Sequence, residues 1–379
     1  MQKNRFLRKA LLGGCILSLG LSLASCAGGK GADLLILSWG EYISDELISE
    51  FEKINNVNVK LATTDSNESM YTMIQNRTAE YDLAIPSDYM IDQMAAENMI
   101  LKLDYSKIDE YHEGLFVPEL QTLMAGDDCK RYDGYYMPYF WGSLGIMYST
   151  KKFPQMKELV EEYGWDILFE ENLRPEGSKV AMYNSSRDAL AAAEMYLGYS
   201  LNTVNKDEIN HAMKVLKDAE FRQWGTDDLK IDISKGALDL ALCYSGDYFD
   251  AYYADMDGGN EDNVANYGIY APSNHNNIFF DGMVIPNTTT NPDLAHKFIS
   301  FMISHHGAYE NAAYVGFCPT VKTVYEEVMQ DEENFGDVTC VPAYSPVNII
   351  NQNVRGEVYS FLGSDTFKYI EKKFTEVLF

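Results

Sequence analysis

Short apolar segments alternate with segments of helical periodicity along most of this chain. In the first cycle, residues 34–37 form an apolar run of strand length, and Leu47, Ile48, Phe51 and Ile54 then recur at the spacing of one helical face. Further strands are expected near 57–61, 81–86, 144–148, 179–183, 238–244 and 282–286, with helices near 66–77, 91–95, 187–198, 207–219, 293–303 and the C-terminus. This alternation predicts an α/β architecture, in which a mainly parallel sheet has helices on both faces.

The length of the chain indicates more than one lobe. It has 379 residues, too many for one simple core. No stretch rich in Pro, Gly or Ser divides it, so we expect the chain to cross between two α/β lobes more than once. The first expected lobe comprises residues 34–142 and 281–325, and the second comprises 143–280 and 326–379.

The N-terminal segment has the pattern of a secretory signal. Four basic residues precede an apolar run over 10–23, which is too short and too broken by glycine for a membrane span. Residues 23–26 read Leu-Ala-Ser-Cys, which resembles the bacterial lipoprotein box, in which the cysteine is lipidated and becomes the mature N-terminus. We predict a signal peptide over 1–26, a lipid anchor on Cys26 and a flexible tether over 27–33. The alternative is an ordinary signal with a chance cysteine.

The charge of the chain restricts its partners. It carries 57 acidic and 30 basic residues, a formal net charge of −27. Nucleic-acid binding is not expected, because phosphate contacts need patches of Lys and Arg. A negative field favours a cationic ligand through electrostatic steering, although it also serves plain solubility.

The sequence shows no motif of a metal centre or of a common enzyme class. Cys129, Cys243, Cys318 and Cys340 lack the C-x-x-C spacing of zinc or redox sites, and a Cys318–Cys340 disulfide is left open. Walker A, H-E-x-x-H, G-x-S-x-G and G-x-G-x-x-G patterns are also absent from the sequence. We therefore predict neither a cofactor nor catalysis.

Aromatic and acidic residues follow several of the expected strands. They are Trp39, Glu41 and Tyr42 after the first strand, Ser87 and Tyr89 after 81–86, Ser185 and Asp188 after 179–183, and Tyr244 and Asp247 at the end of 238–244. Ligands of open α/β sheets bind beyond the carboxyl ends of the strands, so these side chains are expected to converge on one cleft. Asp281 follows Phe279 and Phe280 and is expected at a strand start, as a crossover residue near a hinge.

Aromatic walls with a few carboxylates suit a linear organic cation. Ring faces attract ammonium groups and methylenes, and a carboxylate accepts hydrogen bonds from an ammonium group. In an empty cleft these acids are expected to face water. The alternative interpretation is that the aromatic residues belong to the core and the acids cap helices.

Seven short segments resemble one protein family, in order and with compatible spacing. They are Ser-Trp-Gly-Glu-Tyr at 38–42, Ser-Asn-Glu-Ser-Met-Tyr at 66–71, Tyr-Asp-Leu-Ala-Ile-Pro-Ser at 81–87, Pro-Tyr-Phe-Trp-Gly at 138–142, Leu-Gly-Tyr-Ser at 197–200, Tyr-Ser-Gly-Asp at 244–247 and Phe-Phe-Asp at 279–281. The chain thereby resembles the spermidine/putrescine-binding proteins of bacterial polyamine ABC transporters. The resemblance implies a two-lobed, type II periplasmic-binding-protein fold with the ligand between the lobes.

The resemblance also implies a role for each candidate. Trp39 and Tyr42 would line the cleft, Ser87 and Tyr89 would supply a hydrogen bond and a wall, Phe279 would sandwich methylenes, and Asp247 and Asp281 would hold ammonium groups. Asp188 stands where the family has glutamate, Tyr244 where it usually has tryptophan and Phe317 where tyrosine is common, and Glu41 is a weaker candidate.

Departures from the family pattern bear on the choice of ligand. Ser185 stands where spermidine-preferring relatives have aspartate, and Phe279 and the Ser-Gly-Asp at 245–247 resemble putrescine-preferring relatives, so a diamine is favoured over a triamine. We predict a monomeric, extracytoplasmic solute-binding lipoprotein that delivers putrescine or spermidine to the membrane permease of an ABC transporter. The alternatives are a binding protein for another small solute, such as a sugar or ferric iron, and a secreted glycoside hydrolase that uses Asp247 and Asp281.

Overall fold

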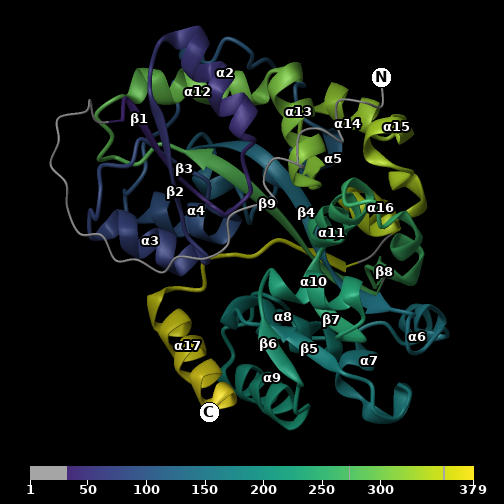
Figure 1. Cartoon of the computed structure of the whole chain (residues 1–379). Helices are drawn as coiled ribbons and strands as arrows, with labels where there is room; N and C mark the ends of the chain where they lie inside the picture. Colours follow the sequence, from purple (N-terminus) through teal and green to yellow (C-terminus); the bar gives the residue numbers. More distant parts are fainter. Residues whose placement is uncertain (1–31, 273, 353–354) are drawn as a thin grey trace, which may run out of the picture.

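The structure is a computed structural model, and it describes residues 32–272, 274–352 and 355–379. The chain forms two α/β lobes, one above the other in Figure 1, joined by the long strands β4 (Tyr136–Ser149) and β9 (His275–Val284). The predicted signal peptide, Cys26 and most of the predicted tether lie outside the described residues. Within the described part, no helix has the length and apolar character needed to cross a membrane.

The upper lobe in Figure 1 is built on a sheet whose N-terminal strands are parallel. These strands are β1 (Leu34–Ser38), β2 (Val59–Thr63) and β3 (Leu83–Ala84), and β9 continues the sheet beside β3. The helices of this lobe and of the segment that follows it are α2 (Asp45–Asn55), α3 (Asn67–Gln75), α4 (Asp88–Ala96), α5 (Pro118–Met124), α12 (Pro292–Ile303), α13 (His305–Val315), α14 (Lys322–Val328) and α15 (Glu332–Phe335).

The lower lobe contains the second group of parallel strands, β5 (Val180–Tyr183), β6 (Gln223–Gly225) and β7 (Leu240–Tyr244). Its helices and those beside it are α6 (Met156–Tyr163), α7 (Asp166–Phe169), α8 (Ser186–Leu197), α9 (Lys206–Asp218), α10 (Asp228–Lys235), α11 (Ser245–Asp257), α16 (Pro346–Asn351) and α17 (Ser364–Leu378). The short strands β8 (Tyr267–Tyr270), β10 (Cys318–Pro319) and β11 (Arg355–Glu357) pair with β4 or β9. Short 3-10 helices cover Tyr105–Lys107, Lys130–Tyr132, Glu171–Leu173, Glu261–Asn266, Val338–Cys340 and Pro342–Tyr344.

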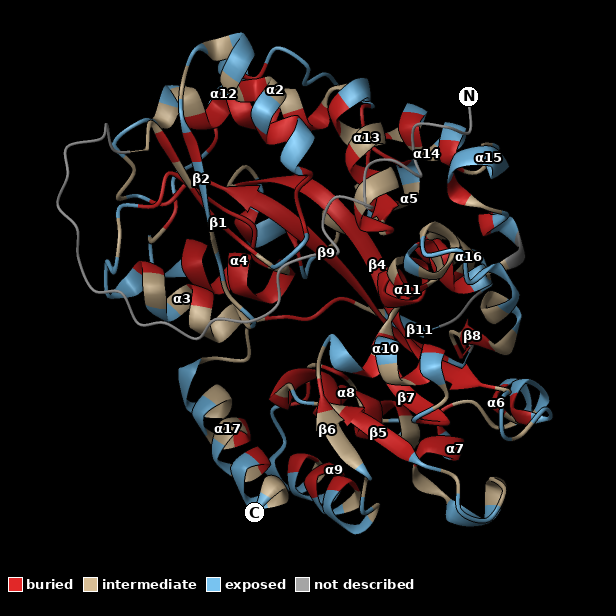
Figure 2. Cartoon of the chain, viewed as in Figure 1, coloured by how far each residue is buried: buried red, intermediate tan, exposed pale blue. Residues whose placement is uncertain are grey.

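The strands β4 and β9 hold the two lobes together. The first part of β4 pairs with β9 and its second part pairs with β7 and β8, and every antiparallel strand pair involves β4 or β9. All residues of both strands are buried, as Figure 2 shows in red. A parallel sheet in each lobe thus meets antiparallel crossing strands, and the two-lobed α/β prediction is confirmed. The exact lobe boundaries stay a prediction.

Local rules explain the helices that begin near the expected cleft. Ser44 caps α2, Ser66 caps α3 and Ser185 caps α8, each accepting a hydrogen bond from a backbone N–H three residues later. These helices follow β1, β2 and β5, so each cap lies just beyond the carboxyl end of a strand.

Two expectations about strands were wrong: the strand expected at 81–86 covers only β3, and Asp281 lies inside β9 rather than at a strand start. The strand expected at 144–148 is confirmed, as the second part of the longer strand β4. β9 begins at His275, seven residues before the strand expected at 282–286; its polar residues His275 and Asn277 are buried and pair with β11. The disulfide left open above is not formed, because Cys318 is a free buried thiol, as are Cys129 and Cys243.

Candidate ligand-binding site

Asp281 is a buried carboxylate with one unused oxygen. It lies on β9, where it forms an antiparallel bridge with Ser87, and its side chain has 5% of its surface exposed. Tyr42 donates its hydroxyl to Oδ2 at 2.5 Å, whereas Oδ1 is buried and has no hydrogen-bond partner among the described residues. Burial raises the pKa of Asp281 to about 6, while hydrogen bonding to Tyr42 and Ser87 lowers it. A buried acceptor of this kind is stabilised by a hydrogen-bond donor, which an ammonium group can supply.

Four aromatic rings extend from Asp281 in a row. The ring of Tyr42 lies 5.7 Å from that of Phe317, which lies 6.1 Å from Phe279, which in turn lies 5.0 Å from Tyr244. All three contacts are edge-to-face, the favoured geometry of ring pairs. Glycine permits this packing, because a Cβ at Gly246 would come within 2.1 Å of the Phe317 ring.

A second buried carboxylate closes the far end of the row. Asp188, in the first turn of α8, is 5% exposed and accepts a hydrogen bond from Tyr359 at 3.2 Å. Burial raises its pKa, and hydrogen bonding to Ser185, Tyr244 and Tyr359 opposes that rise. The row of rings therefore has Asp281 beside Tyr42 at one end and Asp188 beside Tyr244 at the other.

Tyr89 joins the site to residues that the sequence did not single out. Its hydroxyl donates to Glu68 at 2.9 Å, and its ring lies 5.9 Å from that of Tyr359. The guanidinium of Arg187 lies 4.4 Å from the ring centre of Tyr359 and 6.0 Å from that of Tyr89. Glu68 and Arg187 carried a weak signal, because one lies in the family-like segment 66–71 and the other precedes Asp188. Tyr359 follows a strand that no sequence pattern predicts.

Asp247 has internal partners for both oxygens. It lies in the first turn of α11, where Oδ2 accepts the backbone N–H of Tyr244 at 2.8 Å. Its Oδ1 lies 3.7 Å from the ammonium of Lys230, which also pairs with Asp250 at 3.0 Å. Burial raises the pKa of Asp247 to about 6, and Lys230 lowers it. The helix-cap interpretation thus describes Asp247, and its role as an ammonium ligand stays a prediction.

Trp39 and Glu41 lie on the loop after β1. Trp39 is half-buried and its indole Nε1 is buried without a partner among the described residues, whereas Glu41 is exposed with a φ of 52°. No described hydrogen bond or ring contact joins either residue to Asp281 or to the four rings. The structure therefore brings together nine of the predicted residues: Tyr42, Ser87, Tyr89, Ser185, Asp188, Tyr244, Phe279, Asp281 and Phe317.

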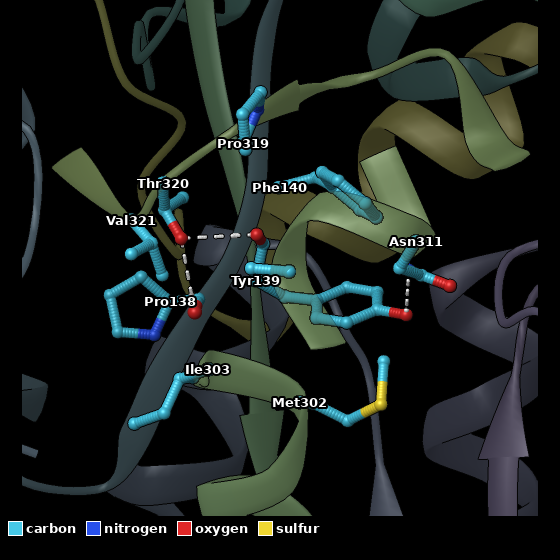
Figure 3. Close-up of a pocket in the computed structure, with 10 residues that line it drawn as sticks. Pro138, Tyr139, Phe140, Met302, Ile303, Asn311, Pro319, Thr320 and Val321 are labelled. Carbon is cyan, nitrogen blue, oxygen red and sulfur yellow. Dashed lines mark hydrogen bonds between the residues drawn. The ribbon is translucent and has the colours of Figure 1, made fainter. Parts of the chain in front are cut away.

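Two cavities are lined by residues other than these nine. The first, of about 10 Å³, lies among Pro138, Tyr139, Asn311 and Thr320 (Figure 3) and has room for one water molecule at most. There Asn311 donates to the Tyr139 hydroxyl at 2.6 Å, and that hydroxyl donates to the carbonyl of Tyr42 at 2.8 Å. This cavity therefore belongs to the support behind Tyr42. The second, of about 620 Å³, is an open hollow between Lys151 and the segment 259–266.

Comparisons with known proteins identify the family. The model of the family described as "Bacterial extracellular solute-binding protein" matches residues 46–336, most of the chain. The chain belongs to this family. More narrowly, it is a member of the spermidine/putrescine-binding proteins of ABC transporters, a non-enzymatic class, so the glycoside-hydrolase alternative is set aside.

Individual relatives cover three quarters of the chain or more. The spermidine/putrescine-binding periplasmic protein of Salmonella typhimurium is 26% identical over 339 residues, 87% of this chain and 90% of the relative. The putrescine-binding periplasmic protein SpuD of Pseudomonas aeruginosa is 28% identical over 295 residues, 75% of this chain and 78% of the relative. A structure from Listeria monocytogenes named for a spermidine/putrescine ABC transporter is 31% identical, with a TM-score of 0.72 over 91% of this chain and 98% of that one. The protein is therefore an extracytoplasmic solute-binding protein of an ABC transporter.

Proposed function

We propose that this solute-binding protein captures a linear polyamine, with putrescine favoured over spermidine, and delivers it to the membrane permease of its transporter. The observation that carries the proposal is the row of four rings with a buried carboxylate at each end. Two acids separated by apolar walls match a molecule with an ammonium group at each end and methylenes between. The names of the two relatives, a spermidine/putrescine-binding and a putrescine-binding protein, support the same ligand class.

The magnitudes are adequate for a transport protein. Each ammonium held by a carboxylate contributes roughly 1.5–3 kcal/mol, and each cation–π contact contributes about 0.5–2 kcal/mol. Two carboxylate contacts and two cation–π contacts sum to about 4–10 kcal/mol before the cost of association, a range that includes the roughly 8 kcal/mol of a micromolar Kd.

The same geometry links binding to closure of the lobes. Tyr42 follows β1 of the upper lobe, Asp188 begins α8 of the lower lobe, and Asp281 lies on the crossing strand β9. A ligand that contacts all three stabilises the arrangement in which the lobes are together.

We further propose that the protein is monomeric and is held at the membrane by lipid on Cys26. A structure with the same fold is named the TpPotD lipoprotein of Treponema pallidum.

Calorimetric titration of the purified protein with putrescine, spermidine and cadaverine tests the ligand class. We expect binding of putrescine at micromolar concentration and weaker binding of the other two. A protein that binds none of the three, and instead binds another small solute such as a sugar, would refute the proposal.

A further inference from the structure

Hydrogen bonds at the start of helix α3 fix the position of Glu68 relative to the site. It lies in the first turn of α3, one residue after Asn67. The amide of Asn67 donates to the hydroxyl of Ser87 at 3.1 Å and accepts the backbone N–H of Ser87 at 3.0 Å. Because Ser87 in turn bridges to Asp281 on β9, the position of Glu68 is fixed relative to the proposed ligand.

Two tyrosines connect Glu68 to the carboxylate of the other lobe. Tyr89 donates to Glu68 at 2.9 Å, and Tyr359 donates to Asp188 at 3.2 Å. The two tyrosine rings meet edge-on at 5.9 Å. An acid on α3 of the upper lobe and an acid on α8 of the lower lobe thus flank one pair of aromatic walls.

This end of the site has more negative than positive charge. Burial raises the pKa of Glu68, hydrogen bonds from its own backbone N–H and from Tyr89 oppose this rise, and the carboxylates of Glu371 and Asp188 add to it. Arg187 lies beside the two tyrosines and donates Nη2 to Asn202 at 2.9 Å. Its guanidinium lowers the pKa of Asp188 and of Glu194, whereas Glu68 forms no ion pair with any described residue. A further cation therefore reduces the repulsion between Glu68 and Asp188.

We infer that Glu68, acting with Asp188 and through Tyr89, makes this end of the site an anchor for a second ammonium group. It thereby determines the preference for diamines over monoamines. A monoamine satisfies Asp281 alone, whereas a diamine also places a charge between Glu68 and Asp188. The inference rests on the proposed function and adds a specificity-determining residue to it.

The test compares two ligands that differ by one amine, putrescine and n-butylamine. Glu68→Gln removes the charge and keeps an oxygen that accepts the Tyr89 hydroxyl. We expect the variant to lose at least tenfold in affinity for putrescine and less than twofold for n-butylamine, measured by calorimetry and by competition against putrescine. The matched control is Glu97→Gln, because Glu97 also accepts a tyrosine hydroxyl, that of Tyr71 at 2.6 Å, but is exposed outside the site. This control should leave both affinities within twofold.

The possible outcomes distinguish a failure of the proposed function from a failure of the role assigned to Glu68. A wild-type protein that binds no polyamine refutes the proposed function itself. A wild-type protein that binds putrescine, with Glu68→Gln either unchanged or weakened equally for both amines, refutes only the role of Glu68. Should Glu68→Gln fail to fold, judged by thermal unfolding, Glu68→Asp keeps the charge. That variant is expected to retain the diamine preference within threefold, and loss of the preference would count against the inference.

Discussion

Neutralising Asp281 tests both the binding site and its energetics. The Asp281→Asn substitution keeps the shape of the side chain and an oxygen that accepts the Tyr42 hydroxyl, but it removes the charge from the unpartnered Oδ1. A hydrogen bond between a charged carboxylate and an ammonium contributes roughly 1.5–3 kcal/mol. We therefore expect the variant to bind putrescine about ten- to a hundredfold more weakly in calorimetry.

The same substitution should stabilise the ligand-free protein. Burial raises the pKa of Asp281 from 3.8 to about 6, and each pKa unit corresponds to about 1.4 kcal/mol. A raised acid pKa means that the folded state binds the proton more tightly, so stability is lost as the pH rises from about 4 through 6. The ionised carboxylate thus costs roughly 3 kcal/mol at pH 7 and above. Urea unfolding should show a stability gain of up to that size for Asp281→Asn at pH 7.5 and a smaller gain at pH 5.

The affinity of the wild-type protein for putrescine should also depend on pH, but it should rise with pH, whereas the stability of the ligand-free protein falls. The ammonium needs an ionised Asp281, so affinity for putrescine should fall by up to about tenfold per pH unit below pH 6, and the Asn variant should lack this dependence. Asp109→Asn, which neutralises an exposed aspartate, is the control and should change neither affinity nor stability. If Asp281→Asn binds within twofold of the wild type, or is less stable at pH 7.5, the assignment of Asp281 as an ammonium anchor is wrong.

Three further substitutions test other parts of the proposal. Phe279→Ala should weaken putrescine binding by about 0.5–2 kcal/mol through lost ring contacts, and should also destabilise the protein by about 3–5 kcal/mol, because Phe279 is buried; unchanged affinity would remove it from the ligand wall. Ser185→Asp should shift competition binding toward spermidine, and a wild type that already binds spermidine tenfold tighter, about 1.4 kcal/mol, would contradict the putrescine preference. Cys26→Ser should release the protein into soluble fractions or leave an unprocessed precursor, and a variant that stays processed and membrane-bound would contradict lipidation.

The sequence predicts the parts of the fold that depend on residues close together in the chain, such as helix caps and the periodicity of buried helix faces. The helices α2, α3 and α8 begin where a serine can cap them, and their buried faces follow the expected periodicity. Because each follows a strand, residues at or after the ends of strands can lie near one another. Of the nine clustered residues, Tyr42, Ser87, Tyr89, Ser185, Asp188 and Tyr244 are placed in this way, whereas Phe279 and Asp281 lie inside β9 and Phe317 precedes β10.

The parts that the sequence does not predict depend on partners far along the chain. The polar start of β9 becomes a buried strand because β11 pairs with it about 80 residues later. Tyr359 reaches Asp188 across 171 residues. The expectation that the acids face water also failed for Asp247 and Asp281, because both are buried, with 5% of each residue exposed. No local pattern reports such contacts.

Asp247 and Asp281 show how a tertiary partner decides the role of a carboxylate. Both are aspartates, both are 5% exposed, and burial raises the pKa of each to about 6. Asp247, however, lies 3.7 Å from Lys230 and receives a backbone N–H, whereas Oδ1 of Asp281 has no partner among the described residues. A ligand ammonium brought to Asp247 must compete with an ammonium already there, while one brought to Asp281 meets an unsatisfied acceptor. We therefore expect one end of a bound diamine to lie at Asp281, with Asp247 holding the start of α11 in place; the other end is assigned to Asp188 beside Glu68 by the inference made above.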